Sequence, residues 1–516
     1  MRIKSSHWPL ASLSLLSFSL TLPPGANADS LGRNAWVPEA MTVRLEDSAL
    51  QIISDGFESF ADEALTDMLL GLRNVKIYDQ GCFLNYTAYI DHVDNVRFDY
   101  PSLQIDARSN NRLAVNFDIT NFRMDFLLDG DGAFCADHYT CNSTITANRI
   151  TASADARLDV VNNHIQTRVI SANANLNGYE YDTESDCFII EIIADILQST
   201  VEAGIEGLIE SYLTEDLPLF VDDAFLMLEF DTEFDIFGET ALLLGQPASV
   251  AINGRGATLG ERGRISGSTD PCGRPFNRFR YTPGNAPTYP ATVPEVGGPY
   301  DFAASIGDDI LNQFLYVGYD SGALCIVLDQ DAEENYGISW GLTTTDLKIV
   351  LPELYAIAPD APVRIDMLPR MAPVVAIGQG DGVVEGQLEA FLLDTELRLY
   401  VGMNNKWELA LVAGVAADAE FLVRVRSDGQ LRILMSDLFN LEINIEDEPL
   451  VDLNDTLVER VIPHFLQIIV PSFFRMLNSI SFPSFLGYDL TPLAILADGP
   501  SRDYLSIYGT LKPTAP

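Results

Sequence analysis

The stretch SDCFIIEIIADILQSTVEAGIEGLIESYL, residues 185–213, has the clearest periodicity in the chain. Apolar residues recur every three or four positions, which predicts a long amphipathic helix over residues 188–213. One face of this helix carries Ile189, Ile193, Leu197, Val201, Ile205, Leu208 and Tyr212. The opposite face carries Asp195, Gln198, Glu202, Glu206 and Glu210.

Three further segments show the same periodicity and predict helices. The first covers residues 57–72, with a stripe of Phe57, Phe60, Ala61, Ala64, Leu65, Met68, Leu69 and Leu72. The second covers residues 302–317, with Phe302, Ile306, Ile310 and Phe314. The third starts near Leu453 and contains ERVIPHFLQIIVPSFFRMLNSISFP, residues 459–483, a very apolar stretch in which Pro471 and Arg475 argue against a membrane span.

Between these helices the apolar period changes to two, as in strands with one packed face. Examples are residues 113–119 and 122–128, residues 397–401, and a hairpin around Ser427-Asp428-Gly429. The pattern favours antiparallel sheets and an α+β fold in which helix, strands and helix occur twice. Residues 254–299 are rich in Gly and Pro and predict a linker without a core of its own, either a solvated connection or, through its arginines, a binding patch.

The first residues predict a secretory signal peptide. Arg2 and Lys4 precede an apolar run, and the small-residue site Ala26–Ala28 follows it, so we expect cleavage before Asp29 and a secreted protein, extracellular or periplasmic. The alternative, a membrane anchor, is disfavoured because the run is short for a span. Six cysteines in an exported chain can oxidise, and the sequence alone leaves their pairing open.

The formal charge of −43 argues against a nucleic-acid partner, and we interpret it as a means of staying soluble. No catalytic constellation is found. GISWG, residues 337–341, places Ser339 in a nucleophile pattern, but a strand-like segment follows it and the only later histidine is His464. DQDAEEN, residues 329–335, lacks the glycine and glutamate of a calcium loop. We therefore expect no enzyme activity, no metal and no cofactor.

Taken together, the chain resembles the lipid-binding family of bactericidal/permeability-increasing protein, lipopolysaccharide-binding protein, and the cholesteryl ester and phospholipid transfer proteins. The resemblance rests on four segments in the family's order: MTVRLEDSALQIISDGFESFADEAL, the stretch at 185–213, YDFAASIGDDILNQFLYVGYDSGAL after the Pro-rich linker, and VIPHFLQIIVPSFFRMLNSISFPSF. It implies a boomerang of two elongated barrels joined by a central sheet, each closed by one long and one shorter helix. The implied domains are a signal peptide (1–28), an N-terminal lipid-binding barrel (41–253), the linker (254–299) and a C-terminal lipid-binding barrel (300–512).

The resemblance also implies apolar grooves that hold acyl chains, with lipid or another apolar small molecule as partner. A membrane or lipoprotein surface, contacted transiently, is a second candidate partner. The groove residues expected from it are Phe57, Leu65, Leu69, Ile193, Leu197, Val201, Ile205, Ile310, Phe314, Ile462, Phe465 and Ile469. The family's disulfide implies a bond from Cys187 to Cys141 or Cys135, of which Cys141 is preferred.

Endotoxin-binding members of the family have a basic N-terminal tip, whereas this half is acidic, so neutral or zwitterionic cargo such as phospholipid or sterol fits better. The expected function is therefore a secreted lipid-binding or lipid-transfer protein. The alternatives are a secreted interaction or matrix protein of the same fold with filled grooves and, less favoured, an endotoxin-binding protein or a serine hydrolase.

Overall fold

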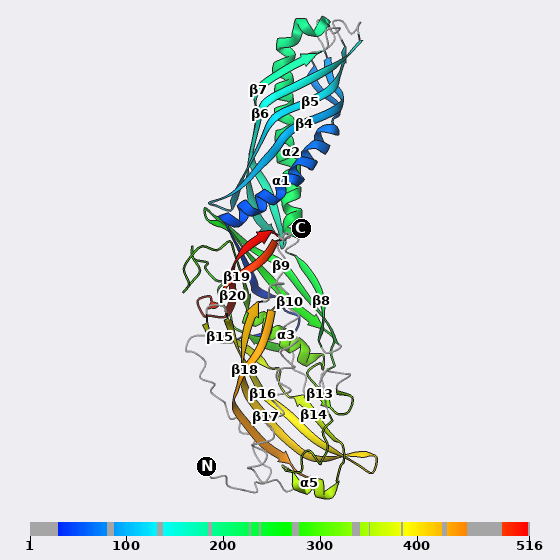
Figure 1. The fold of residues 1–516 in the computed structure, drawn as a ribbon, viewed down its shortest axis with the longest axis vertical. Helices are drawn as coiled ribbons and strands as arrows, with labels where there is room; N and C mark the ends of the chain where they lie inside the picture. The colour runs from blue at the N-terminus through cyan, green and yellow to red at the C-terminus, as the bar shows by residue number, and fades with distance from the viewer. Residues whose placement is uncertain are drawn as a thin grey trace.

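The protein is elongated, and its three large sheets follow one another along the long axis (Figure 1). The computed structural model describes residues 29–79, 87–131, 138–183, 188–226, 229–236, 239–270, 278–332, 341–349, 351–382, 385–425, 431–450 and 488–513. Every strand pairing among the described residues is antiparallel. Most pairings join strands that are neighbours in the chain, whereas those of β2 and β12 join strands that are far apart in the sequence. The expected α+β class, with two barrel-like halves and a sheet between them, is confirmed.

The N-terminal half consists of one five-stranded sheet and two helices. The strands, in sheet order, are β3 (Arg73–Asp79), β4 (Thr87–Arg108), β5 (Arg112–Asp131), β6 (His138–Val161) and β7 (His164–Thr183). Helix α1 (Asp47–Leu70) packs along β4, and helix α2 (Phe188–Leu226) packs along β7. The one long and one shorter helix expected for this half are both present.

The central sheet draws strands from both halves of the chain. Its order is β19 (Tyr488–Asp498), β20 (Tyr504–Pro513), β12 (Phe302–Gly307), β2 (Val37–Glu46), β10 (Gly256–Gly267), β9 (Glu239–Asn253) and β8 (Phe230–Ile236). The contact between β12 and β2 joins the two halves, since β12 begins the second half and β2 the first. A separate two-stranded sheet pairs β1 (Asp29–Gly32) with β11 (Arg278–Tyr281).

The C-terminal half has the third sheet and its own helix. The strands are β13 (Ile326–Leu328), β14 (Val363–Pro369), β16 (Glu385–Met403), β17 (Lys406–Val425) and β18 (Leu431–Asp447), with β15 (Val374–Gly382) paired to β16. Helix α3 (Asp308–Asp320) is almost entirely buried, and the short α5 (Pro352–Ile357) lies at the far end (Figure 1). The long helix expected around residues 459–483 lies outside the described residues.

Asn-Asn pairs lie in three of the long hairpins, and one of them, Asn110 and Asn111, lies between β4 and β5. Asn162 and Asn163 join β6 to β7, and Asn404 and Asn405 join β16 to β17, all with φ between 50° and 65°. Both central residues of a two-residue type I′ turn need positive φ, and asparagine tolerates it better than other residues with side chains. These turns fix the register of the strands that follow.

Three expected helices have different bounds in the structure. Helix α2 ends at Leu226, thirteen residues beyond the expected end at residue 213. Helix α1 starts at Asp47, ten residues before the expected start at residue 57. The expected helix over residues 302–317 is wrong in its first part, because residues 302–307 form β12 between β2 and β20 and only the rest is helical. All six residues of β12 are buried, and an apolar run that is buried all round fits a central strand as well as a helix.

The expected linker, residues 254–299, is shorter in the structure and is packed. Its first part is β10, a strand in the interior of the central sheet. Later in this segment, Tyr289 and Val293 join a small buried cluster on the central sheet together with Tyr300 and Tyr508. The Tyr289 hydroxyl group lies 2.7 Å from Ser305 Oγ. The segment is therefore held to the sheet by an apolar cluster and buried hydrogen bonds.

Candidate functional site

The inner face of the N-terminal sheet, which faces α1 and α2, carries two rows of apolar side chains in direct cross-strand register. We call them the inner rows; they are Leu103, Phe117, Ala152 and Ala174, and Ile105, Val115, Ala154 and Ala172. Ala152, Ala154 and Val115 are buried, whereas Leu103, Phe117, Ile105, Ala172 and Ala174 remain partly exposed. The middle of this sheet is thus apolar and incompletely covered, unlike a closed core.

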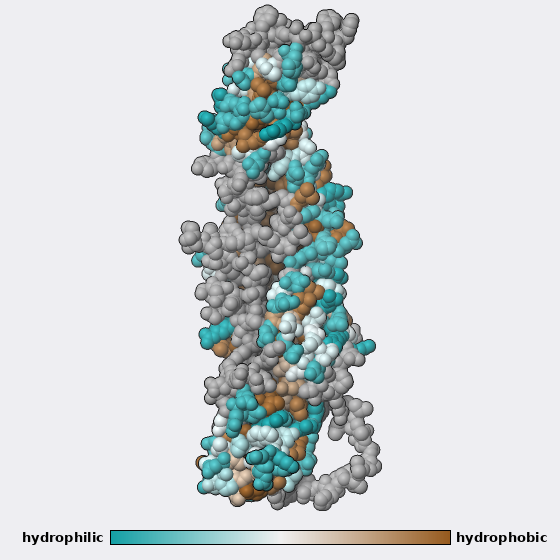
Figure 2. Space-filling view, turned by 90° about the vertical axis from the view of Figure 1, so that its right-hand side faces the viewer, coloured by the Kyte–Doolittle hydropathy of each residue, from teal (hydrophilic) through white to brown (hydrophobic). Residues whose placement is uncertain are grey.

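Small side chains set the depth of these rows. Four alanines lie on β6 and β7 at neighbouring positions, and alanine occupies far less volume than the Leu, Ile and Phe residues found elsewhere on this face. Further along the same face, Phe122, Met124 and Phe126 of β5 are fully buried. Figure 2 shows brown, apolar side chains at the surface of this upper half of the molecule, between polar ones.

Helix α2 is fastened to the free edge of β7 by three carboxylates. Glu206 accepts a hydrogen bond from the backbone N–H of Leu176 (3.0 Å), Glu210 from that of Ala174 (3.1 Å) and Asp222 from that of Thr167 (2.7 Å). Edge strands present unpaired N–H groups that invite pairing with another chain. The helix satisfies these groups with side chains, so it closes the sheet without itself being a strand.

Side chains of helix α1 likewise bind backbone groups in the part of β4 that has no neighbouring strand on that side. Asp47 Oδ1 accepts from the N–H of Ala107 (3.3 Å), and Gln51 Nε2 donates to the carbonyl of Ile105 (3.0 Å). The inner rows therefore lie between two helices that are each attached to one edge of the sheet. Glu206 and Glu210 belong to the polar face predicted for residues 188–213, but the sequence did not indicate that they bind a strand. The side chains of Asp195 and Gln198 on the same predicted face are not described.

Replacing both Glu206 and Glu210 with alanine is expected to loosen α2 from β7. The N–H groups of Leu176 and Ala174 would lose charged acceptors, and hydrogen bonds to charged groups contribute roughly 1.5–3 kcal/mol each. Amide hydrogen exchange should rise at these two residues. The matched control is Glu180→Ala on exposed β7 surface, which should leave their exchange unchanged. Equal exchange in both variants would show that α2 is held by apolar packing alone.

The predicted groove residues have three outcomes. Leu69 and Ile205 are buried in the core of the N-terminal half, close to the inner rows. Ile310 and Phe314 are 2% and 1% exposed in the core of the C-terminal half, and the Phe314 ring stacks on Phe234 with ring centres 5.1 Å apart. For the others no side chain is described: Phe57 and Leu65 on α1, Ile193, Leu197 and Val201 on α2, and Ile462, Phe465 and Ile469 outside the described residues.

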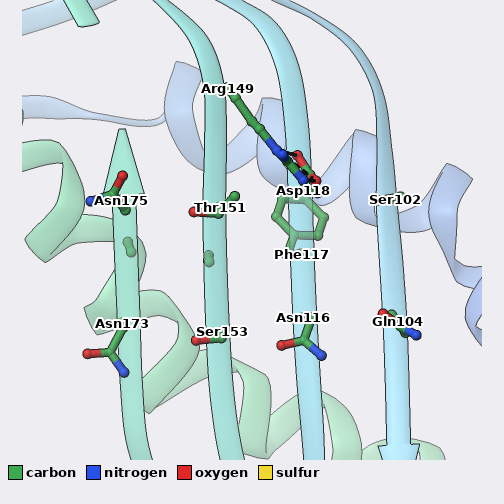
Figure 3. Close-up of a pocket in the computed structure, with 12 residues that line it drawn as sticks. Ser102, Gln104, Asn116, Phe117, Asp118, Arg149, Thr151, Ser153, Asn173 and Asn175 are labelled. Carbon is green, nitrogen blue, oxygen red and sulfur yellow. Dashed lines mark hydrogen bonds and ion pairs between the residues drawn. The ribbon is translucent and has the colours of Figure 1, made fainter. Parts of the chain in front are cut away.

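The outer face of the same sheet is polar and hollowed. A hollow of about 360 Å³ lies over two further cross-strand rows, Gln104, Asn116, Ser153 and Asn173, and Ser102, Asp118, Thr151 and Asn175. Figure 3 shows these side chains on four adjacent strands, with the helices behind the sheet. A second hollow of about 450 Å³ is lined by Asp94, Asp125, Asn142 and Asp182 among others. Most of the lining residues are polar and suit polar groups, although Phe117, Ala152 and Ala174 of an inner row also reach the first hollow.

Three neighbouring arginines on this outer face are paired with carboxylates. Arg108, Arg112 and Arg157 stand in register on neighbouring strands with Arg168 next to them, an arrangement of like charges that is unfavourable without compensation. Three ion pairs offset this repulsion: Arg112 with Asp155 at 2.8 Å, Arg157 with Asp159 at 3.0 Å, and Arg108 with Asp106 at 3.8 Å. The arginines of residues 254–299 are also engaged, since Arg262 and Arg264 both lie over the Trp36 ring.

The metal and nucleophile patterns considered from the sequence can be compared with the described part of the chain. No group of three or more His, Cys, Asp or Glu there could hold a metal ion. His92 and His164 each have a carboxylate partner, at 2.8 Å and 2.7 Å, on different parts of the N-terminal half. Ser339 and His464 lie outside the described residues. Among the described helices none is long and apolar enough to span a membrane.

Of the predicted disulfide between Cys141 and Cys187, only Cys141 lies in the described part of the chain. Cys141, on β6, and Cys325 are both disulfide-bonded. The other four cysteines lie outside the described residues, so the pairing of Cys141 with Cys187 stays a prediction. Cys141 is 3% exposed and belongs to the core of the N-terminal half.

Comparison with known proteins yields structural likeness only. No family model matches the sequence. No curated protein sequence matches it either. The structure is similar to the crystal structure of lipopolysaccharide binding protein over 93% of this chain and 100% of that one, with a TM-score of 0.49 and 13% identity. It is also similar to P47 of Clostridium botulinum E1 over 94% and 100%, with a TM-score of 0.28 and 8% identity. At these values neither likeness assigns a ligand to this chain.

Proposed function

We propose that the protein is a secreted lipid-binding or lipid-transfer protein that holds the acyl chains of its ligand against the inner rows of the N-terminal sheet. The observation that carries the proposal is the partial exposure of Leu103, Phe117, Ile105, Ala172 and Ala174 on a face that is otherwise a closed apolar core. The resemblance of the four helical and strand segments to a lipid-binding family supports it independently.

The apolar character of the inner rows is enough to hold a ligand. Each methylene group moved out of water contributes about 0.8 kcal/mol. A chain of eight buried methylenes would thus gain about 6 kcal/mol before the costs of association, without any polar contact. A phospholipid, a sterol or another apolar molecule fits this chemistry. The protein is expected to take up its lipid during transient contact with a membrane or lipoprotein surface.

The second candidate is a secreted interaction or matrix protein of the same fold whose inner rows are closed in solution. The two candidates differ in whether α2 moves away from the inner rows, because the carboxylates of Glu206 and Glu210 on α2 can hold the helix against β7 with no ligand present. A lipid carrier should contain ligand when purified from its own host, about one or two molecules per chain. Native mass spectrometry that shows only the polypeptide mass would favour the second candidate.

Filling the inner rows tests the position of the ligand. Ala172→Phe adds a ring to an inner row and should reduce bound lipid at least fivefold, while the protein remains folded. The control is Asn173→Phe, on the next residue of the same strand but on the outer face, which should keep the wild-type lipid content. Equal lipid content in the two variants would place the ligand elsewhere.

Anionic lipids should bind without strong salt dependence. Arg112 and Arg157 are each paired with an aspartate, and the chain as a whole carries a formal charge of −43. Few counterions would be released on contact with phosphate groups, so endotoxin should bind weakly, and its affinity should change less than tenfold between 50 and 200 mM salt. Tight binding that is lost on adding salt would support the endotoxin-binding alternative.

Export is part of the proposal and has its own test. Cleavage before Asp29 predicts that the mature protein starts at this residue, which sequencing of the N-terminus determines. Asp29 is also the first residue of β1, so the strand pairing with β11 begins directly at the expected cleavage site. A mature protein that retains residues 1–28 would favour a membrane anchor.

A further inference from the structure

The hollow of about 360 Å³ on the outer face of the N-terminal sheet follows β6 as a short trough (Figure 3). Its floor carries the short, half-buried side chains of Thr151 and Ser153 on β6. Longer side chains stand on the two neighbouring strands, Asn116 and Asp118 on β5 and Asn173 and Asn175 on β7. Because neighbouring strands lie about 4.8 Å apart, these two walls are about 10 Å apart. The volume lies within the range of small-ligand sites.

An ion pair marks each end of the trough. At one end Arg149 of β6 binds Asp118 of β5, with Arg149 Nε 2.9 Å from Asp118 Oδ1. At the other end Arg112 of β5 binds Asp155 of β6 at 2.8 Å. Residues 149 and 155 are six positions apart on β6, so the stretch between the two ion pairs is about 20 Å long.

The trough carries no net charge, although the chain as a whole has a formal charge of −43. Of the twelve residues that line it, only Asp118 and Arg149 are charged, and they are paired with each other. Charged residues return on the same face beyond each end, for example the pair Arg157 and Asp159 and the pair Arg123 and Asp125. A charged ligand would find no free counter-charge in the trough, so its composition favours a neutral ligand.

The polar side chains of the trough are not used to hold the fold together. Within the described part of the chain, Gln104, Ser153, Asn173 and Asn175 make no side-chain hydrogen bond. Asparagine is depleted in strands, yet SANANLN, residues 171–177, places three asparagines at alternate positions on the outer face of β7. Residues that go against local propensity without a contact in the fold are typical of functional sites.

We propose that the trough binds a neutral oligosaccharide, a chain of sugar rings without phosphate, sulfate or carboxylate groups. Each sugar hydroxyl donates and accepts hydrogen bonds, and side-chain amides and hydroxyls supply both functions. The two polar rows of the trough are two residues apart on each strand, about 7 Å, so they can bind hydroxyls at successive places along the sugar chain.

The sugar site is separate from the inner rows, which lie on the opposite face of the sheet, so it does not depend on lipid binding. A peptide is the less favoured occupant. The backbone groups of β5, β6 and β7 already pair with one another, so an extended peptide cannot add to the sheet at the trough.

The first test measures the binding of four neutral oligosaccharides to the whole protein by saturation-transfer NMR and calorimetry. The probes are cellohexaose, maltohexaose, mannohexaose and chitohexaose. At least one of them should bind with a Kd of about 1 mM or lower. A sulfated heparin hexasaccharide should bind at least about tenfold more weakly, because the protein is strongly acidic and the trough offers no free cation.

Substitutions in the trough test the position of the sugar. Asn175→Ala removes one amide from a wall and should raise the Kd about fivefold, the effect of one neutral hydrogen bond. Ser153→Phe fills the floor and should abolish binding. The matched control is Asn142→Ala, an exposed asparagine on β6 about 30 Å along the strand from Thr151, which should leave the Kd unchanged. Asn175 is exposed, so its variant decides the matter even if Ser153→Phe fails to fold.

The two faces of the sheet provide a crossed control. Asn173→Phe should lose the oligosaccharide and keep the lipid, whereas Ala172→Phe should lose the lipid and keep the oligosaccharide. The sugar site would be overturned if none of the four probes bound, if the wild type and Asn175→Ala bound equally, or if a Gly-Ser peptide bound more tightly than every probe. Each of these results would leave lipid binding intact, and loss of lipid binding alone would leave the sugar site intact.

Discussion

Replacing Asp308 with asparagine is expected to make the protein more stable than the wild type at pH 8, with a smaller difference at pH 5. Asp308 begins α3 and is 7% exposed. Burial first, and then Asp309 and Asp503, raises its pKa to about 8. The folded protein therefore holds a proton that the unfolded chain releases at about pH 4, and folding stability falls as the pH rises from about 4 to about 8.

The size of this loss follows from the shift in pKa. At 1.36 kcal/mol per pKa unit, Asp308 alone accounts for a loss on the order of 5 kcal/mol across this window. The groups facing it are Asp309, whose pKa burial raises to about 7, Asp503, and Arg280, which favours the ionised form. One buried oxygen of Asp503 has no hydrogen bond, so the arrangement has few donors to offer a charge.

Urea unfolding at pH 5, 7 and 9 measures the effect. The free energy of unfolding of the wild type should decline steadily, and that of Asp308→Asn should decline less. Asp231→Asn, on the exposed surface of β8, is the control and should follow the wild type. Parallel pH profiles for the wild type and Asp308→Asn would show that Asp308 is ionised in the folded protein at neutral pH.

The sequence predicts the elements of this fold well where periodicity and burial agree. The stripe from Ile189 to Tyr212 predicts α2 because one face of that helix is apolar and the other is polar. Residues 302–307 defeat the same argument, since a strand buried on both faces shows no alternation. The Asn-Asn pairs at 162–163 and 404–405 are hairpin signals in the sequence, because asparagine tolerates the positive φ that both residues of each turn adopt.

The functional site is less predictable because it depends on register. Leu103, Phe117, Ala152 and Ala174 come from four different strands, and only the pairing of those strands places them in one row. A lone alanine in a strand predicts neither a core nor a groove. Glu261 on β10 shows the converse, because a single glutamate in a strand is ordinarily taken to face solvent, whereas this side chain is buried through the position of β10 inside the central sheet.

Truncating Phe314 tests whether this residue is part of the core or contacts the ligand. We expect Phe314→Ala to cause a large loss of stability. In the structure its ring is 1% exposed and stacks on Phe234. Phe314→Ala would remove that packing and leave a cavity, at a cost of about 3–5 kcal/mol. Phe117, in an inner row, is already partly exposed and so has less packing to lose. Phe117→Ala should therefore reduce the free energy of unfolding by about half as much as Phe314→Ala, or less.

For lipid content the order should be reversed, with the larger change in Phe117→Ala. Per folded molecule, Phe314→Ala should keep the wild-type lipid content, whereas Phe117→Ala should change the amount or the size of the bound lipid, because the inner row gains space. Thermal unfolding together with mass spectrometry of extracted lipid gives both quantities. If Phe314→Ala melts like the wild type and loses lipid, Phe314 lines a second binding site, as the sequence predicted. The buried C-terminal core would then open to ligand in solution, and the groove would extend through both halves of the protein.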